Sequence, residues 1–522
     1  MKRLAVLVAA AAMLLTGCAE MMNPDPLASD LASELEEYQS RQEYLPEPGA
    51  EEPEPEPELP SAFSLPYHKD HTLDPVTCPE GLQDVVSSLL YEPLFRLDKS
   101  FHPEPVLCGS YEWDETGLVC TLELREGVSF SDGSALTARD VVENLLRAKE
   151  SERYAYRLRH VTGITANRAG QVLLTLDAPN QGLPALLDIP VVKRTTAEQM
   201  VPVGTGPYML VSDSEGTCLQ AREDWWQQKN LPVNSIPLIH AKDQDTALHL
   251  FHSKRIELLT VDPTADVSQV NGKSEAVSQP TTILQFIGFN TAEGRLFADP
   301  ALRGLFSQGI DRETLVHAQL AQLAAAAQFP VSPEAEIYPK DLEKAYREEE
   351  FLDALRTAGQ DSGETKELTF LVGGSDSFRS TSARYIAEHL SVLVWRINVV
   401  ELPWEEYLAA LEAGDFDLYF GEVRLTADWD LTDLLGTEGS LNYGGYTNAA
   451  TDLLLQNFAA AGNRQDAAKQ LFSHLQVYTP IAPVCFKNYS VLTHPNVVEG
   501  IEPAPGGVFH GIESWKIHLK TA

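Results

Sequence analysis

One short polar stretch, RLTADW from Arg424 to Trp429, has residue types that could bind a charged small molecule. It directly follows a predicted strand, FDLYFGEV, and ligands of open α/β sheets lie beyond the carboxyl ends of strands. A carboxylate at this position, Asp428, can pair with a cationic group. It can equally cap a helix running from Trp429 to Leu435, so the sequence leaves both roles open.

No other constellation in the chain indicates catalysis. The sequence has no G-x-S-x-G, H-E-x-x-H, Walker or S-x-x-K motif. His68 and His71 lie three apart on a segment expected to be extended, so their side chains should point to opposite faces and hold no metal. Cys108 and Cys120 lie on adjacent predicted strands and could form a disulfide or stay free and buried. We therefore expect no catalytic residue, metal or cofactor.

Alternating strands and helices should position the polar stretch. Residues 368–428 read as strand LTFLV, a helix within STSARYIAEHLSVL, strand INVVEL, helix WEEYLAALEAG ended by Gly414, and the strand before Arg424. This order predicts parallel strands joined by right-handed crossovers.

A second segment, Leu118 to Ala148, is predicted to be a strand, a tight loop and a capped helix. Its first part alternates apolar and polar residues, and Asp132-Gly133 supplies a turn. Thr137 is the expected N-cap, with Asp140 completing a capping box. Further upstream, DVVSSLLYEPLFRLD (84–98) is expected to be helical.

The same segment resembles the signature of the extracytoplasmic solute-binding proteins of the peptide/nickel importer family (family 5). That family's pattern is roughly F-x-L-R-x-G-V-x-F-x-D-G-x-x-L-T-A-x-D-V. Matches here are Leu124-Arg125, Gly127-Val128, Phe130, Asp132-Gly133, Leu136-Thr137-Ala138 and Asp140-Val141. The resemblance extends over essentially all of residues 61–520.

The resemblance implies an α/β, two-lobed periplasmic-binding-protein-like fold (type II, cluster C) with an extra subdomain in the first lobe. The implied ranges are 61–82, 205–287 and 486–522 for lobe I, 83–204 for its extra subdomain, and 288–485 for lobe II. Independently, the more than 450 residues after the tether are too many for a single core and imply at least two lobes.

The resemblance also implies a binding site. The family's W-x-A-D-Y segment corresponds to Leu425–Trp429, so Asp428 should pair with a peptide's α-ammonium while the main chain of Leu425, Thr426 and Ala427 adds the peptide as a strand. Trp429 and the loop at Gly81 should lie beside the ligand. Tyr443 and Tyr446 should either line a side-chain pocket or pack structurally. Leu425 departs from the family's aromatic residue, and Asp430-Leu431 departs from its Asp-Pro.

The function so implied is capture of a peptide between two closing lobes and delivery to a membrane permease with its ATPase, by a monomer. Nickel chelate, haem or oligosaccharide remain alternative cargoes, and a peptide-sensing surface receptor remains an alternative role. A surface hydrolase is a further alternative that no spacing supports.

The N-terminus predicts export. Residues 1–18 have a basic start, an apolar run and Leu-Thr-Gly-Cys, which resembles a bacterial lipobox and implies diacylation of Cys18 on the extracytoplasmic face of a membrane. The alternative is an ordinary secretory signal with an incidental cysteine. Residues 19–60 hold thirteen acids and one base and end in Pro-Glu repeats, predicting an extended tether. Without the signal and the tether, residues 61–522 still carry a net charge of about −27 of the chain's −37, which argues against nucleic acid or an anionic membrane surface as partner.

Overall fold

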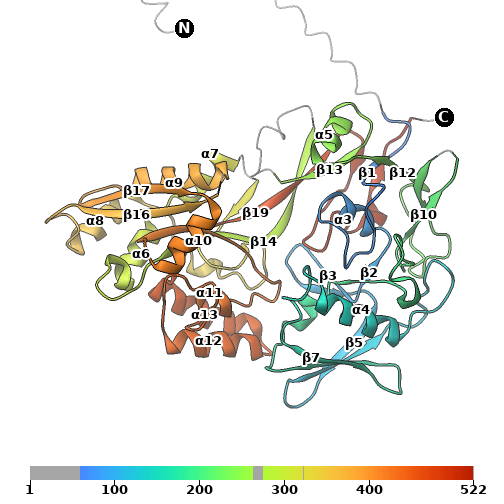
Figure 1. Ribbon diagram of the computed structural model, residues 1–522, viewed down its shortest axis with the longest axis horizontal. Coiled ribbons are helices and arrows are strands. Elements are labelled where there is room, and N and C mark those ends of the chain that lie inside the picture. Colours follow the sequence, from blue (N-terminus) through green and yellow to red (C-terminus); the bar gives the residue numbers. More distant parts are fainter. Residues whose placement is uncertain (1–58, 215, 263–273, 321–322, 375, 521–522) are drawn as a thin grey trace, which may run out of the picture. The chain divides into compact units, whose positions relative to one another are not determined.

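The computed structural model describes residues 59–520 except 215, 263–273, 321–322 and 375. The expectations for the signal and Cys18, and nearly all of the expected tether, lie outside the described residues. Leu59–Ala522 forms one compact unit with the two-lobed α/β fold (Figure 1). Among the described helices, none has the length and apolar character to cross a membrane.

The first lobe is built on a four-stranded sheet in which only β1 and β12 are parallel. Its core includes Phe63, Tyr208 and Trp515, all buried. The sheet order is β1 (Leu65–Tyr67), β12 (Ser235–His240), β11 (Thr217–Ala221), β10 (Tyr208–Ser212), with α3 (Leu82–Ser87), α5 (Gln244–His252), η6 (Ile512–Ser514) and the pair β20 (Val498–Glu499) and β21 (Lys516–Ile517) around it.

Residues 94–191 share a separate hydrophobic core, and we call this segment the subdomain. Its helix α4 (Ala138–Glu150) starts at the predicted N-cap: the Thr137 hydroxyl accepts from the Asp140 amide, and the Asp140 carboxylate accepts from the Thr137 amide. The capping box is therefore confirmed. Its other elements are the antiparallel sheet β5 (Cys108–Trp113), β6 (Val119–Leu124), β8 (Val172–Leu176), β7 (Val161–Ala166), the pair β3 (Phe95–Leu97) with β4 (Pro103–Pro105), and the 3₁₀ turn η1 (Leu183–Leu186). At its boundary, β9 (Pro190–Val191) pairs with β2 (Glu92–Pro93), which precedes the subdomain, and the 3₁₀ turn η2 (Arg194–Thr196) follows it.

The second lobe contains the predicted parallel strands. β18 (Leu418–Arg424), β16 (Lys366–Gly373) and β17 (Trp395–Leu402) pair in parallel, connected by α9 (Ser377–Leu390) and α10 (Trp404–Ala413). Gly414 ends α10 in a left-handed conformation, φ 71°, as its position predicts.

Helices cover this sheet on both faces, which explains why its strands are apolar on both sides. One face packs on α6 (Pro300–Gln308), α7 (Arg312–Leu320), α8 (Glu348–Thr357) and α9. The opposite face packs on α10, α11 (Thr432–Leu435), α12 (Ala449–Ala460) and α13 (Arg464–Tyr478). The remaining 3₁₀ turns are η4 (Leu296–Ala298) and η5 (Lys340–Leu342).

Two long antiparallel strands, β14 (Glu275–Phe289) and β19 (Ile481–Thr493), run from one lobe to the other (Figure 1). Toward the first lobe β19 also pairs with β13 (Leu258–Val261), and toward the second lobe β14 pairs with β18 and β19 with β15 (Ala324–Ala326). Their pairing shifts register between Pro280 and Leu284, where the first-lobe half meets the second-lobe half. This irregularity is the natural place for bending, because the ladder hydrogen bonds are interrupted there.

Two local expectations are wrong. The predicted helix 84–98 stops at Ser87, because the chain beyond it pairs as β2 and β3 and Pro93 cannot donate a helical hydrogen bond. The rings of His68 and His71 stack with centroids 3.7 Å apart, since a turn, closed by the His71 amide on the His68 carbonyl, replaces the extended segment.

The two cysteines on adjacent strands are both free and buried. The strands pair as predicted, but Cys108 lies opposite Leu124 and Cys120 opposite Trp113, so the thiols do not face each other. Burial raises the pKa of Cys108 to about 11 and that of Cys120 to about 12. Both thiols are therefore inert core side chains.

Candidate functional site

The stretch from Leu425 to Trp429 leaves the end of β18 and turns sharply. The Leu425 amide donates to the Thr282 carbonyl at 2.9 Å, and the Trp429 amide donates to the Thr426 carbonyl at 2.9 Å. Trp429 has φ 58°, a left-handed conformation that few bulky residues adopt. Its indole is buried at 5.0 Å from the ring of Phe101 in the subdomain, so the stretch is fixed by packing from two parts of the molecule.

Asp428 is only 5% exposed. One carboxylate oxygen accepts a 2.8 Å hydrogen bond from the side-chain amide of Asn180, and the other accepts a longer, 3.4 Å bond from the Asp430 amide. Arg464 donates to the main-chain carbonyl of Asp428. The second carboxylate oxygen can therefore accept one further, stronger hydrogen bond.

The alternative role of Asp428 as a helix cap is wrong. Helix α11 begins at Thr432, three residues later than predicted, and its N-cap is Leu431. The Thr432 amide is instead bound by the Asp430 carboxylate at 2.9 Å. The side chain of Asp428 is therefore not needed to start this helix.

Several polar groups beside Asp428 are uncommitted. The hydroxyl of Thr426 is buried and has no hydrogen-bond partner among the described residues. Among the described residues, the backbone amides of Thr426, Ala427 and Asp428 likewise donate to no backbone carbonyl. Buried polar groups are nearly always paired, so this segment is suited to form hydrogen bonds with a bound molecule, with its amides as donors.

The loop of Gly81 approaches the start of this stretch. Glu80 lies 3.7 Å from Arg424, whose guanidinium also donates to the Tyr489 hydroxyl at 3.2 Å. Gly81 itself has φ 94° and open space where a side chain would be, and it begins α3. First-lobe and second-lobe segments predicted to meet the ligand are thus neighbours.

The two tyrosines lie apart from this cluster. Tyr446 is buried, its hydroxyl 2.8 Å from that of Thr451, and Tyr443 is half-buried against Tyr419. Among the described residues, neither tyrosine makes a hydrogen bond or ring contact with Leu425–Trp429. Their contribution to a side-chain pocket stays a prediction.

Sequence patterns did not identify Asn180, Gly182 or Arg464. A Cβ on Gly182 would lie 2.6 Å from the Asp428 Cβ and 2.5 Å from an Arg464 guanidinium nitrogen. Its backbone, φ −81°, is ordinary, so glycine provides room here and not a special conformation. The only hint in the sequence is the loop composition of PNQGLP, which does not reveal what the loop contacts.

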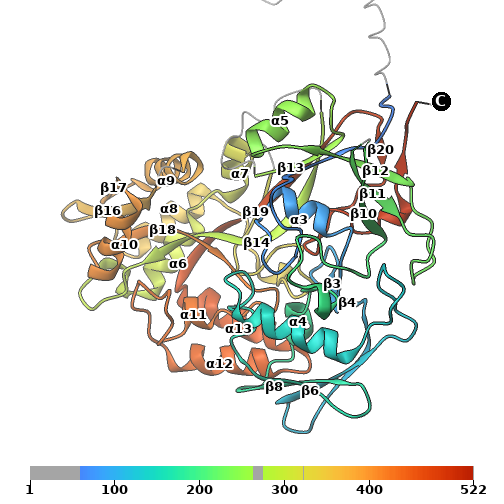
Figure 2. The same ribbon diagram turned by 45° about the vertical axis from the view of Figure 1, so that its right-hand side comes forward.

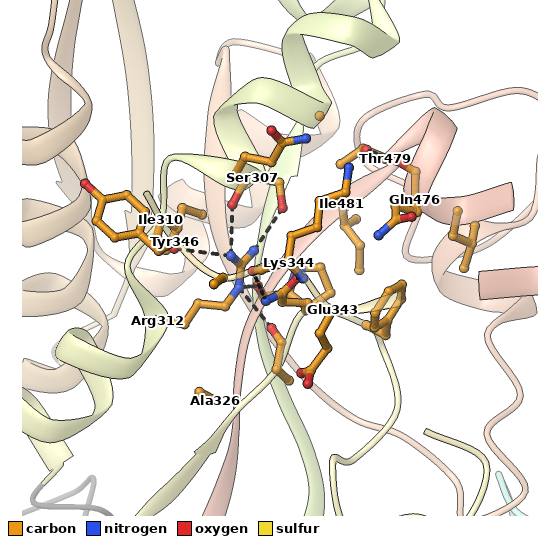
Figure 3. Close-up of a pocket in the computed structure, with 18 of the residues that line it drawn as sticks. Ser307, Ile310, Arg312, Ala326, Glu343, Lys344, Tyr346, Gln476, Thr479 and Ile481 are labelled. Atoms are coloured by element: carbon orange, nitrogen blue, oxygen red, sulfur yellow. Dashed lines mark hydrogen bonds between the residues drawn. The ribbon is translucent and has the colours of Figure 1, made fainter. Parts of the chain in front are cut away.

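A cavity of about 720 Å³ lies elsewhere, in the second lobe around Arg312 (Figure 3). The guanidinium of Arg312 donates to the carbonyls of Ala327, Pro483 and Ser307 and to the Ser307 hydroxyl, at 2.7–3.0 Å. Burial lowers its pKa to about 10. None of the predicted site residues lines this cavity, and Arg312 acts as a structural clamp whose donors are satisfied by the protein.

The described residues contain no group of three or more His, Cys, Asp or Glu side chains arranged to hold a metal ion. Near the stacked His68 and His71, the ring of His240 lies edge-on to that of His68 at 5.2 Å.

The sequence matches the model of the bacterial extracellular solute-binding proteins, family 5, over residues 102–439. The glutathione-binding protein GsiB of Salmonella typhi is 26% identical over 278 residues, covering 50% of this chain and 54% of that protein, so the chain spans about half the length of this curated relative. GsiB of Pectobacterium atrosepticum is 25% identical over 423 residues, covering 76% of this chain and 82% of that protein.

Solved structures share the fold. The unliganded open form of the periplasmic murein tripeptide-binding protein MppA aligns with a TM-score of 0.73 at 18% identity, covering 88% of this chain and 98% of that one. NikZ of Campylobacter jejuni in complex with Ni(L-His) aligns with a TM-score of 0.60 at 18% identity, covering 87% and 99%. The family match covers well over half of the chain and agrees with the two-lobed fold. This chain therefore belongs to the bacterial extracellular solute-binding proteins of family 5.

Proposed function

We propose that the chain is the lipid-anchored solute-binding component of an ATP-driven importer, that it captures a peptide between its lobes, and that it delivers the peptide to a permease. Family membership supports the solute-binding role. The predicted lipid on Cys18 would keep the protein at the extracytoplasmic face. A binding role needs no nucleophile or general base, and the buried thiols described above are unreactive.

The observation that carries the peptide proposal is the set of uncommitted polar groups at Thr426–Asp428. A peptide main chain laid along this segment would satisfy the free amides, as in β-strand addition, without demanding particular side chains. Its terminal ammonium would donate to the carboxylate oxygen of Asp428 that holds only the 3.4 Å bond. GsiB, named for glutathione, is a relative whose ligand is itself a tripeptide.

The test compares short peptides that have free N termini with the same peptides acetylated at the N terminus. In Asp428→Asn, affinity for the free peptides should fall by about 1.5–3 kcal/mol, because a charge-assisted hydrogen bond is lost. Affinity for the acetylated peptides should change little, which removes the discrimination. Titration calorimetry on the full chain gives both numbers, with Asp353→Asn on the exposed face of α8 as the matched control.

Equal binding of free and acetylated peptides by the unaltered protein would contradict the role of Asp428. A nickel chelate is the second candidate, because NikZ shares the fold with a bound Ni(L-His). Native mass spectrometry of the chain purified without denaturation distinguishes the two: a ladder of peptide masses supports the proposal, and a single metal–ligand mass refutes it.

A further inference from the structure

The subdomain lies beside α11–α13 (Figure 2), and two sets of direct contacts join it to the ligand segment and these helices. At the outer set, Arg159 lies 2.5 Å from the Asp430 carboxylate and 3.7 Å from that of Asp433. The Tyr156 hydroxyl donates to Asp433 at 2.7 Å, and the Arg159 guanidinium stacks over the Tyr156 ring at 3.9 Å. The side chains of Arg159 and Asp430 are 24% and 17% exposed, so solvent screens this ion pair less than a surface pair.

The inner set involves the loop of Asn180, Gln181 and Gly182. The Gln181 amide donates to the Ala459 carbonyl at the end of α12, at 2.8 Å. Asn180 holds one oxygen of the Asp428 carboxylate. Gly182 packs so closely on Asp428 and Arg464 that no side chain fits.

We infer that these contacts form a latch, made of Tyr156, Arg159 and residues 180–182, that closes the subdomain onto the second lobe and positions the Asp428 carboxylate for cargo. Only the claim that the latch positions Asp428 for cargo rests on the proposed function. The contacts join protein atoms directly, so they stabilise the closed arrangement whatever ligand is bound. Affinity for every cargo is then scaled by the fraction of protein in the latched state.

Two kinds of substitution separate the latch from the ligand contact. Gly182→Val inserts a steric wedge without changing any charge, because its Cβ falls on Asp428 and Arg464. Gly462→Val is its control, since a Cβ there meets nothing within 4 Å. Asp430→Asn combined with Asp433→Asn removes both carboxylates that pair with Arg159.

The first measurement uses the ligand-free full chain, stripped by unfolding and refolding. Small-angle scattering should show a larger radius of gyration for Gly182→Val than for Gly462→Val. Hydrogen exchange should show lost protection of the Gln181 amide, which donates across the latch. The Asp430/Asp433 double variant should show the same change, because Arg159 then loses both of its carboxylate partners.

The second measurement tests coupling to cargo. The Asp430/Asp433 double variant should weaken binding of free and acetylated peptides by the same factor, about tenfold, which corresponds to about 1.4 kcal/mol. Gly182→Val should weaken the free peptides further, because its Cβ also falls on Asp428. Asp428→Asn should instead weaken only the free peptides. The ligand-free results remain decisive even if no peptide binds, so failure of the peptide proposal is distinguishable from failure of the latch.

Unchanged scattering and unchanged Gln181 protection in both Gly182→Val and the double variant would overturn the latch. If Gly182→Val does not fold, as judged by loss of its cooperative melt, the double variant decides alone.

Discussion

Replacing Glu257 by glutamine should abolish a pH-dependent loss of stability in the first lobe. Glu257 is 3% exposed, and its carboxylate accepts the Ser64 amide at 2.5 Å while its own amide donates to the Ser64 carbonyl. Among the described residues no cation pairs with it within 4 Å. Burial raises its pKa from the ordinary 4.5 to about 7, because the hydrogen bonds from Ser64 offset only part of the lost hydration of the charged form.

The sign follows from proton binding. Between pH 4.5 and about 7 the folded chain keeps the proton that the unfolded chain has released, so the free energy of unfolding falls as pH rises. Below pH 4.5 both states are protonated and the effect of Glu257 is absent. At about 1.4 kcal/mol for each unit of pKa shift, the total loss above pH 7 is about 3 kcal/mol.

Glutamine keeps an acceptor oxygen for the Ser64 amide but carries no charge at any pH. The difference in unfolding free energy between Glu257→Gln and the unaltered protein should therefore be near its minimum at about pH 4.5 and rise by about 3 kcal/mol by about pH 8. Urea denaturation across this range measures it, with the exposed Glu112→Gln on β5 as control. A difference that stays constant with pH, or falls, would refute the assignment of a buried, unpaired carboxyl.

Three further substitutions test other features of the molecule. Arg312→Met should lower the unfolding free energy by about 3 kcal/mol, since it leaves several buried carbonyls without donors, whereas the exposed Arg347→Met should change urea denaturation little. Thr137→Ala should cost about 1 kcal/mol by removing the N-cap of α4, measured by the same denaturation; a loss below a few tenths would mean that Asp140 alone suffices. Cys18→Ser should move the protein from the membrane fraction to the soluble fraction, and retention in the membrane would refute the lipid anchor.

Local patterns predicted what depends on neighbours in the chain. The βαβ order with its parallel pairing, the cap at Thr137 and the end of α10 at Gly414 are all confirmed. Each rests on spacing within a few residues, where hydrogen-bond and packing preferences act directly. The failures at 84–98 and at His68–His71 arise where pairing with distant strands or a turn overrides local preference.

Packing decides which residues belong to the first lobe and which to the subdomain. Val86, Leu89 and Tyr91, which the expected ranges place in the subdomain, pack in the core of the first lobe. The core of the subdomain itself runs from Leu94 to Val191. Apolar spacing identifies buried residues but not the core in which they are buried.

By itself, the sequence determined the family, the alternating α/β order and the position of Asp428 beyond a strand end, because these follow from short-range patterns and motifs. Only the tertiary structure decided which groups surround that carboxylate. Asn180 and Gly182 lie some 250 residues earlier in the chain than Asp428, and loop residues carry no periodic signal of their partners. Their contact depends on how two separately packed cores meet, which is fixed by burial and complementary charge in three dimensions.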